Sequence, residues 1–166
     1  MKRVFATSFL VFLLRVCLPV WAQIERLDDS SSPRSQVRAS LDGGGTITSP
    51  NAPVSPIVRV SFGTIQYRLN TSRYVGRRAR IFYVLPAGVP GLRSPGALQV
   101  TWRTDGLFTS GTGHPGDRVQ VWNGVVRDAW INESLDLGWQ VDMRQLRLTR
   151  GAPLGFEAYF EIEILP

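Results

Sequence analysis

The chain of 166 residues contains 19 basic and 13 acidic residues, a formal net charge of +6, and 43% of its residues are hydrophobic. It has one cysteine and one histidine, so it cannot form an internal disulfide or a zinc site built from several cysteines. The length suits a single domain with one hydrophobic core.

The first 22 residues are typical of a secretory signal peptide. Lys2 and Arg3 precede an apolar stretch over residues 4–14, and the segment ends at Ala22 in the sequence Val-Trp-Ala. The apolar stretch is shorter than the roughly 20 residues of a membrane-spanning helix, so cleavage after Ala22 is favoured over a retained anchor. We therefore expect export through the periplasm to the cell surface or the medium, without an integral membrane span. The single cysteine, Cys17, would be lost with the leader.

Residues 23–55 are interpreted as a flexible N-terminal arm, because they are rich in Ser, Gly, Pro and Asp and contain no aromatic residue. Within them only Val37, Ala39 and Leu41 alternate as a strand would. The predicted organisation is thus a leader over residues 1–22, an arm over residues 23–55 and a folded domain over residues 56–166.

From residue 56 onward, apolar residues recur with the period of two that indicates strands. The first run covers residues 58–69, and Gly63 shifts its phase, which predicts a β-bulge. The run over residues 79–85 is apolar on both faces and predicts a central strand. Leu98, Val100 and Trp102 share one face of the next run.

The second half of the domain continues this pattern. Asn123-Gly124 lies between two β-type runs and predicts a hairpin with a type I′ turn. Another run alternates over residues 135–143, and the last alternates over residues 156–164, with three glutamates on its polar face. Short strands separated by Gly/Pro turns, with no helical periodicity after the leader, predict an all-β fold. We expect an antiparallel, immunoglobulin-like β-sandwich with a flexible N-terminal arm.

The only histidine, His114, is expected to belong to a turn. The sequence His114-Pro115-Gly116-Asp117 fits a type II turn, with proline second and glycine third. A metal or catalytic role would need further histidines, cysteines or acids that the sequence does not place beside it. We therefore predict no metal and no cofactor.

The rest of the sequence contains only a few candidates for catalytic or ligand-binding residues. Two carboxylates among the C-terminal acids would suffice for a small hydrolase, but Glu157, Glu161 and Glu163 fit solvated positions on a strand, so no catalytic residue is predicted. The arginine-rich stretch over residues 68–80 fits a solvated or ion-paired face better than a nucleic-acid site. Trp122 and Trp130 are candidates for stacking on a sugar.

The general layout resembles the subunits of bacterial chaperone–usher fimbriae: an exported all-β domain, an N-terminal arm and a last strand, FEAYFEIEILP, that runs to the final residue. The resemblance implies an incomplete sandwich that a periplasmic chaperone, and then the arm of a neighbouring subunit, complete by strand addition. This chain lacks the cysteine pair common in such subunits. The residues that would take part in strand exchange are Val37, Ala39, Leu41, Phe156, Phe160, Ile162 and Ile164.

The expected function is that of a non-enzymatic, exported β-sandwich serving as a structural or adhesive surface subunit of fimbrial type. Its partners would be a chaperone and neighbouring subunits, and not nucleic acid. Residues 43–104 contain eight arginines and no acid, while most acids follow residue 104, which would suit head-to-tail stacking of subunits. The alternative is a secreted carbohydrate-binding module that uses exposed tryptophans.

Overall fold

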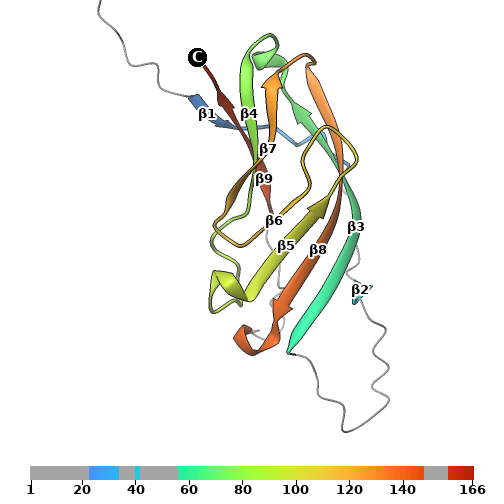
Figure 1. Ribbon diagram of the computed structural model, residues 1–166, viewed down its shortest axis with the longest axis vertical. Helices are drawn as coiled ribbons and strands as arrows, with labels where there is room; N and C mark the ends of the chain where they lie inside the picture. The colour runs from blue at the N-terminus through green and yellow to red at the C-terminus, as the bar shows by residue number, and fades with distance from the viewer. Residues whose placement is uncertain (1–22, 34–39, 42–55, 148–156) are drawn as a thin grey trace, which may run out of the picture.

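The computed structural model describes residues 23–33, 40–41, 56–147 and 157–166. These residues form two antiparallel sheets that pack against each other, which confirms the predicted all-β sandwich (Figure 1). Sheet A has the strand order β1-β9-β4-β7, and sheet B has the order β2-β3-β8-β5-β6. The strands are β1 (Gln23–Arg26), β2 (Ser40–Leu41), β3 (Ile57–Asn70), β4 (Arg78–Val84), β5 (Leu98–Arg103), β6 (Gly111–Gly113), β7 (Arg118–Val125), β8 (Trp130–Asp142) and β9 (Tyr159–Ile164). Three short 3₁₀ helices, η1 (Ser72–Tyr74), η2 (Pro95–Ala97) and η3 (Met143–Gln145), lie between strands.

Most connections pass from one sheet to the other. This is true of the connections from β3 to β4, β4 to β5, β6 to β7, β7 to β8 and β8 to β9, whereas β5 and β6 are consecutive and pair in one sheet. The two sheets are therefore tied together by the chain itself, and each sheet combines strands that are distant in the sequence.

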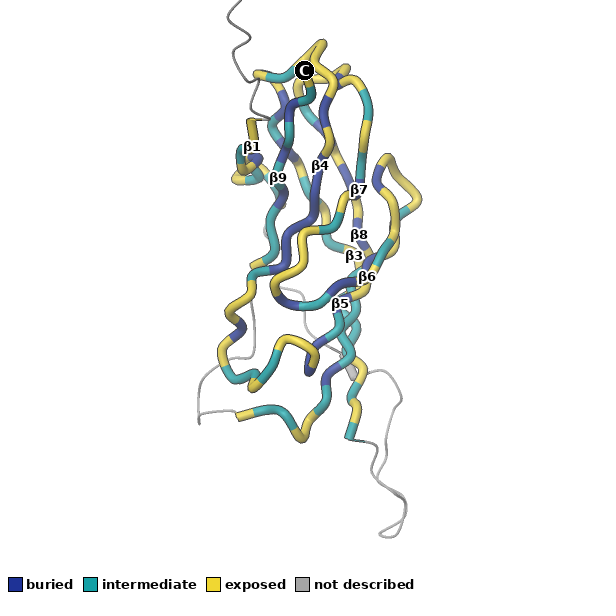
Figure 2. The backbone as a smooth tube through the Cα atoms, turned by 60° about the vertical axis from the view of Figure 1, so that its left-hand side comes forward, coloured by how far each residue is buried: buried dark blue, intermediate teal, exposed yellow. Residues whose placement is uncertain are grey.

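The core lies between the sheets, and β4 contributes most to it. Ala79, Ile81 and Tyr83 are at most 1% exposed, and β4 pairs with β7 on one side and with β9 on the other, as predicted for a central strand. Figure 2 shows this strand buried along most of its length. The alternating residues Leu98, Val100 and Trp102 of β5 fill the core from sheet B, as their shared face predicts.

The phase shift predicted at Gly63 is confirmed. Ser61 pairs with Gly138 and Gly63 pairs with Leu137, so Phe62 is an extra residue in the ladder between β3 and β8. Gly63 has a φ of +68°, a conformation that glycine adopts without steric cost. The bulge keeps the residues before and after it on the core side of one long strand.

The predicted hairpin at Asn123-Gly124 is wrong. Strand β7 runs through this pair, with Asn123 opposite Arg80 and Gly124 opposite Ala79 of β4. Gly124 is not among the described glycines with a positive φ. A turn there would place the following run beside β7 and remove the end of the β4–β7 ladder. The chain instead passes to sheet B after Val125, so tertiary pairing overrides the local turn preference.

Residues 23–33 belong to the sandwich, although the sequence analysis placed them in the arm. Strand β1 pairs with β9 in an antiparallel register that matches Gln23 with Ile164 and Arg26 with Glu161. Leu27, which follows β1, is 2% exposed, and its N–H donates to the Phe160 carbonyl oxygen at 2.8 Å. A four-residue strand followed by one buried leucine has too little alternation to stand out in a sequence.

Candidate ligand-binding site

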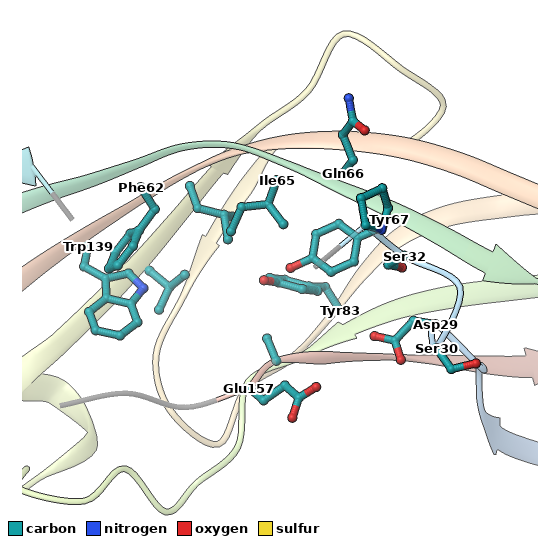
Figure 3. A pocket seen from close by; sticks show the side chains of 14 residues that line it. Asp29, Ser30, Ser32, Phe62, Ile65, Gln66, Tyr67, Tyr83, Trp139 and Glu157 are labelled. Carbon is teal, nitrogen blue, oxygen red and sulfur yellow. The ribbon is translucent and has the colours of Figure 1, made fainter. Parts of the chain in front are cut away.

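A pocket of about 390 Å³ lies between the sheets on the side where β3 of sheet B faces the beginning of β9 of sheet A. Strand β1 covers β9 only over residues 161–164, with one further backbone hydrogen bond to Phe160. Beyond this point, toward the beginning of β9, side chains of both sheets line the pocket (Figure 3). We call this pocket the aromatic slot; the residues that define it are Phe62, Tyr67, Tyr83 and Trp139, with Ile65, Val100 and Leu137 between them and Asp29 and Glu157 at its rim.

The bulge in β3 places the aromatic side chains of the slot. Phe62, the extra residue of the bulge, has its ring centroid 4.6 Å from that of Trp139 on β8, with an angle of 59° between the planes. Tyr67, further along the same strand, packs edge-on against Phe160 at 5.0 Å. Tyr83 packs edge-on against Trp102, also at 5.0 Å. The inner wall of the slot is therefore continuous with the aromatic core.

Two tyrosines bring hydroxyl groups into this apolar wall. The hydroxyls of Tyr67 and Tyr83 share a hydrogen bond. Burial raises the pKa of Tyr83 well above its usual range and also raises that of Tyr67. The negative charges of Asp29 and Glu157 raise the pKa of Tyr67 further, which places both carboxylates within electrostatic reach of its hydroxyl. The slot thus combines aromatic rings with hydroxyl and carboxylate oxygens.

The two candidate tryptophans lie outside the aromatic slot. Trp122 on β7 is partly buried against the core, and its ring fills the space where Gly124 lacks a side chain. Trp130, at the start of β8, has the Arg68 guanidinium 4.5 Å from its ring centroid. One ring is thus used in packing and one face of the other is covered. Phe62 and Trp139, which were not among the candidate ligand-binding residues, form the aromatic pair that lines the slot.

The candidate strand-exchange residues are only partly described. Val37, Ala39 and Phe156 lie outside the described residues. Leu41 belongs to β2 and pairs with Val60 of its own chain. Phe160, Ile162 and Ile164 are between 0% and 5% exposed, because β9 lies between β1 and β4 and its apolar face packs on sheet B.

His114 begins the predicted turn. The Asp117 N–H donates to the His114 carbonyl oxygen at 2.9 Å, and Gly116 has a φ of +97°. The imidazole Nδ1 lies 2.9 Å from the Leu98 carbonyl oxygen, and the Asp117 carboxylate accepts the His114 N–H at 2.7 Å. The backbone geometry confirms the turn assignment, and the imidazole connects the turn to the start of β5.

The sequence analysis missed Glu133, a buried acid that organises the loop between β5 and β6. Glu133 is 4% exposed, and its carboxylate accepts the N–H groups of Leu107 at 2.8 Å and Phe108 at 3.0 Å and the hydroxyl of Thr104. A Cβ at Gly106 would lie 1.9 Å from Glu133 Oε1, so only glycine fits there. The signal was present in the alternation Ile131, Glu133, Leu135, which places the acid on the core face of β8.

The remaining acids do not form a metal site. No group of three or more His, Cys, Asp or Glu side chains suited to a metal ion occurs among the described residues. Glu161 and Glu163 lie on the outer face of β9, where Arg118 of β7 contacts them at 2.7 Å and 3.8 Å. Arg80 faces Glu163 in the register of β4 and β9. Basic and acidic parts of the sequence therefore interleave on sheet A.

Comparison of the chain with known protein families, curated proteins and solved structures finds no match. In the part of the chain that the structure describes, no helix is long and apolar enough to cross a membrane.

Proposed function

We propose that the chain is an exported, non-enzymatic β-sandwich that serves as a structural or adhesive surface subunit of fimbrial type. In this role it accepts an extended segment of a protein partner in the aromatic slot. Strand or segment addition at a sheet edge combines backbone hydrogen bonds with pockets for alternate side chains. The partners would be neighbouring subunits and, during export, a chaperone.

The position of the aromatic slot between β3 and β9 is the main support for this proposal. The chain's own β1 pairs with residues 161–164 of β9, and the slot lies where that pairing ends. Apolar side chains from both sheets line it, including Ile65, Leu137 and Ala158. Burying each apolar side chain of a partner would contribute about 1.5–3 kcal/mol, so a few such contacts favour binding of a segment.

Size-exclusion chromatography with light scattering tests the proposal. The full chain, purified in the form that export yields, should form oligomers whose mass increases with concentration. The variant Ala158→Phe should fill the slot and reduce this association, whereas Val125→Phe, at an exposed position of β7, serves as the matched control and should not. Monomers at every concentration, both for the chain alone and with extended peptides taken from its own N-terminal region, would contradict the proposal.

The alternative of carbohydrate binding through Trp122 and Trp130 receives no added support from the geometry, because packing and Arg68 occupy these rings. The same protein preparation can be titrated with a glycan panel while tryptophan fluorescence is followed. A shift that disappears in Trp130→Leu would favour this alternative over the subunit role.

A further inference from the structure

The charge of the aromatic slot has the opposite sign to that of the chain. The whole chain has a net charge of +6, yet among the described residues Asp29 and Glu157 line the slot and no lysine, arginine or histidine does. Among the described residues neither carboxylate forms an ion pair. Figure 3 shows both carboxylates on the same side of the slot, below the ring of Tyr83. A cationic group would be attracted there and an anionic one repelled.

The aromatic rings favour the same sign of charge. The face of an aromatic ring carries partial negative charge and attracts a cation within about 6 Å of its centroid. Phe62 and Trp139 present such rings at one end of the slot, and the half-buried ring of Tyr67 lies nearer the carboxylates, whereas Tyr83 is 1% exposed and only backs the wall. Because the slot is partly shielded from water, these attractions are weakened less by solvent than they would be on an open face.

A guanidinium group fits this combination better than an ammonium group. It is flat and weakly hydrated, so it stacks on a ring while donating paired hydrogen bonds to a carboxylate. Among the described residues a guanidinium stacks on a ring in three places, with guanidinium carbon to ring centroid distances of 3.4–4.6 Å; the pairs are Arg26 with Tyr159, Arg68 with Trp130 and Arg118 with Phe82. Lys2 is the only lysine of the sequence. A second copy would therefore offer arginine almost exclusively.

From these observations we infer that the aromatic slot is a specific receptor for an arginine side chain, presented by an extended segment of a second copy of this chain. The inference rests on the proposed function, since it names the chemistry by which the slot selects its partner segment. The apolar stem of the arginine would pack against the paired rings of Phe62 and Trp139, and the guanidinium would reach Asp29 and Glu157. Arginine would thus fix the register of the bound segment.

Small amides test the slot separately from assembly. N-acetyl-arginine amide is titrated into the full chain while tryptophan fluorescence and calorimetry are followed, beside N-acetyl-lysine amide and N-acetyl-citrulline amide. Citrulline has nearly the shape of arginine without its charge. We expect saturable binding of the arginine amide, at least about ten-fold weaker binding of the lysine amide, and no detectable binding of the citrulline amide.

Variants assign the binding to the slot. The double variant Asp29→Asn, Glu157→Gln should weaken binding of the arginine amide at least about ten-fold. The control variant Glu161→Gln, Glu163→Gln removes two acids from the outer face of sheet A and should leave it unchanged. Circular dichroism checks that each variant is folded, and the single variant Glu157→Gln, at an exposed position, replaces the double variant if that one fails to fold.

The outcomes separate this inference from the proposed function. Equal binding of arginine and citrulline amides, or equal losses in slot and control variants, would overturn the arginine inference even if the chain self-associates. Binding of the arginine amide with the expected variant effects supports it, even if light scattering finds only monomers and the subunit role fails. Self-association that the slot variant weakens and the control variant does not would support both.

Discussion

The two long edges of the sandwich differ in how the space between the sheets is covered. At the edge formed by β6 and β7, the loop before β6 places Phe108 in the core. The next residue, Thr109, fixes this loop to both sheets. Its N–H donates to the Val121 carbonyl oxygen at 2.8 Å, and its carbonyl oxygen accepts the Trp102 indole N–H at 3.0 Å. At the edge formed by β3 and β9, the corresponding space is the aromatic slot. One edge is sealed by a loop of the chain itself, and the other leaves aromatic surface accessible.

The sealed edge depends on a polar anchor within the core. A loop that enters an apolar core must satisfy its backbone N–H groups, because each unpaired one would cost about 1–3 kcal/mol. Glu133 satisfies those of Leu107 and Phe108. At the slot, by contrast, the acids Asp29 and Glu157 have no such role among the described residues. A buried carboxylate can thus close one edge of a sandwich, whereas carboxylates at the rim of a pocket leave the other edge available to a ligand.

The largest expected effect concerns aromatic truncation and distinguishes the core behind the accessible edge from the slot itself. Phe160 is fully buried and packs against Tyr67, Tyr83 and Phe108. We expect Phe160→Ala to lower the free energy of unfolding by about 3–5 kcal/mol, because it leaves a cavity in the core. Phe62→Ala makes the same change in the half-exposed slot and should cost less than half as much. Urea denaturation followed by circular dichroism measures both values, and equal losses would mean that the slot is part of the core.

The next effect concerns the anchor of the sealed edge. Glu133→Ala leaves two backbone N–H groups and the Thr104 hydroxyl without their acceptor, so we expect a loss of about 3 kcal/mol in the free energy of unfolding. Glu161→Ala removes an acid from the outer face, where its ion pair with Arg118 should be worth about 1 kcal/mol or less. Hydrogen exchange should also be faster at Leu107 and Phe108 in Glu133→Ala. Similar losses in both variants would contradict the anchor role.

A smaller effect is expected at the turn that joins β6 to β7 on the sealed edge. Gly116 has a φ of +97°, which a β-branched residue adopts only with strain, so Gly116→Val should cost about 1 kcal/mol or more. His114→Asn should cost less, about 0.5 kcal/mol, because it leaves the turn backbone unchanged and alters only the contact of the imidazole with the Leu98 carbonyl oxygen. Thermal unfolding of the two variants measures the difference. A large loss for His114→Asn would show that the imidazole does more than begin the turn.

For physical reasons, the strands of these regions are easier to predict from the sequence than the slot is. Alternation predicts β3 and β5 because the two faces of a strand meet different environments, and a run that is apolar on both faces predicts the central β4. Prediction from the sequence fails at Asn123-Gly124, because pairing with β4 keeps β7 extended against the preference of the turn pair. The slot was beyond reach, since Phe62 and Trp139 meet only through the β3–β8 register and Tyr83 comes from the other sheet. Glu133 was within reach, because an acid between two core positions requires partners.

The last expected effect appears only at alkaline pH and concerns the contact that holds β1 beside β9 at the accessible edge. The Tyr74 hydroxyl donates to the Glu25 carboxylate of β1. Partial burial, followed by this hydrogen bond and the charge of Glu25, raises the pKa of Tyr74 from 10.0 to about 12. The neutral phenol is therefore favoured in the folded state. Its stabilising contribution is complete below pH 10 and is lost as the pH rises through about 12.

Alkaline denaturation of the wild type beside Tyr74→Phe isolates this contribution from those of Tyr67 and Tyr83, whose pKa values are also raised. Between pH 10 and 12 the free energy of unfolding should fall more steeply in the wild type, by a linked slope of at most about one proton per molecule. Glu25→Gln keeps an acceptor but removes the charge, so it should move the extra fall toward lower pH. Parallel curves for wild type and Tyr74→Phe would mean that ionisation of Tyr74 does not change the free energy of unfolding. The hydrogen bond from Tyr74 to Glu25 would then not hold β1 beside β9.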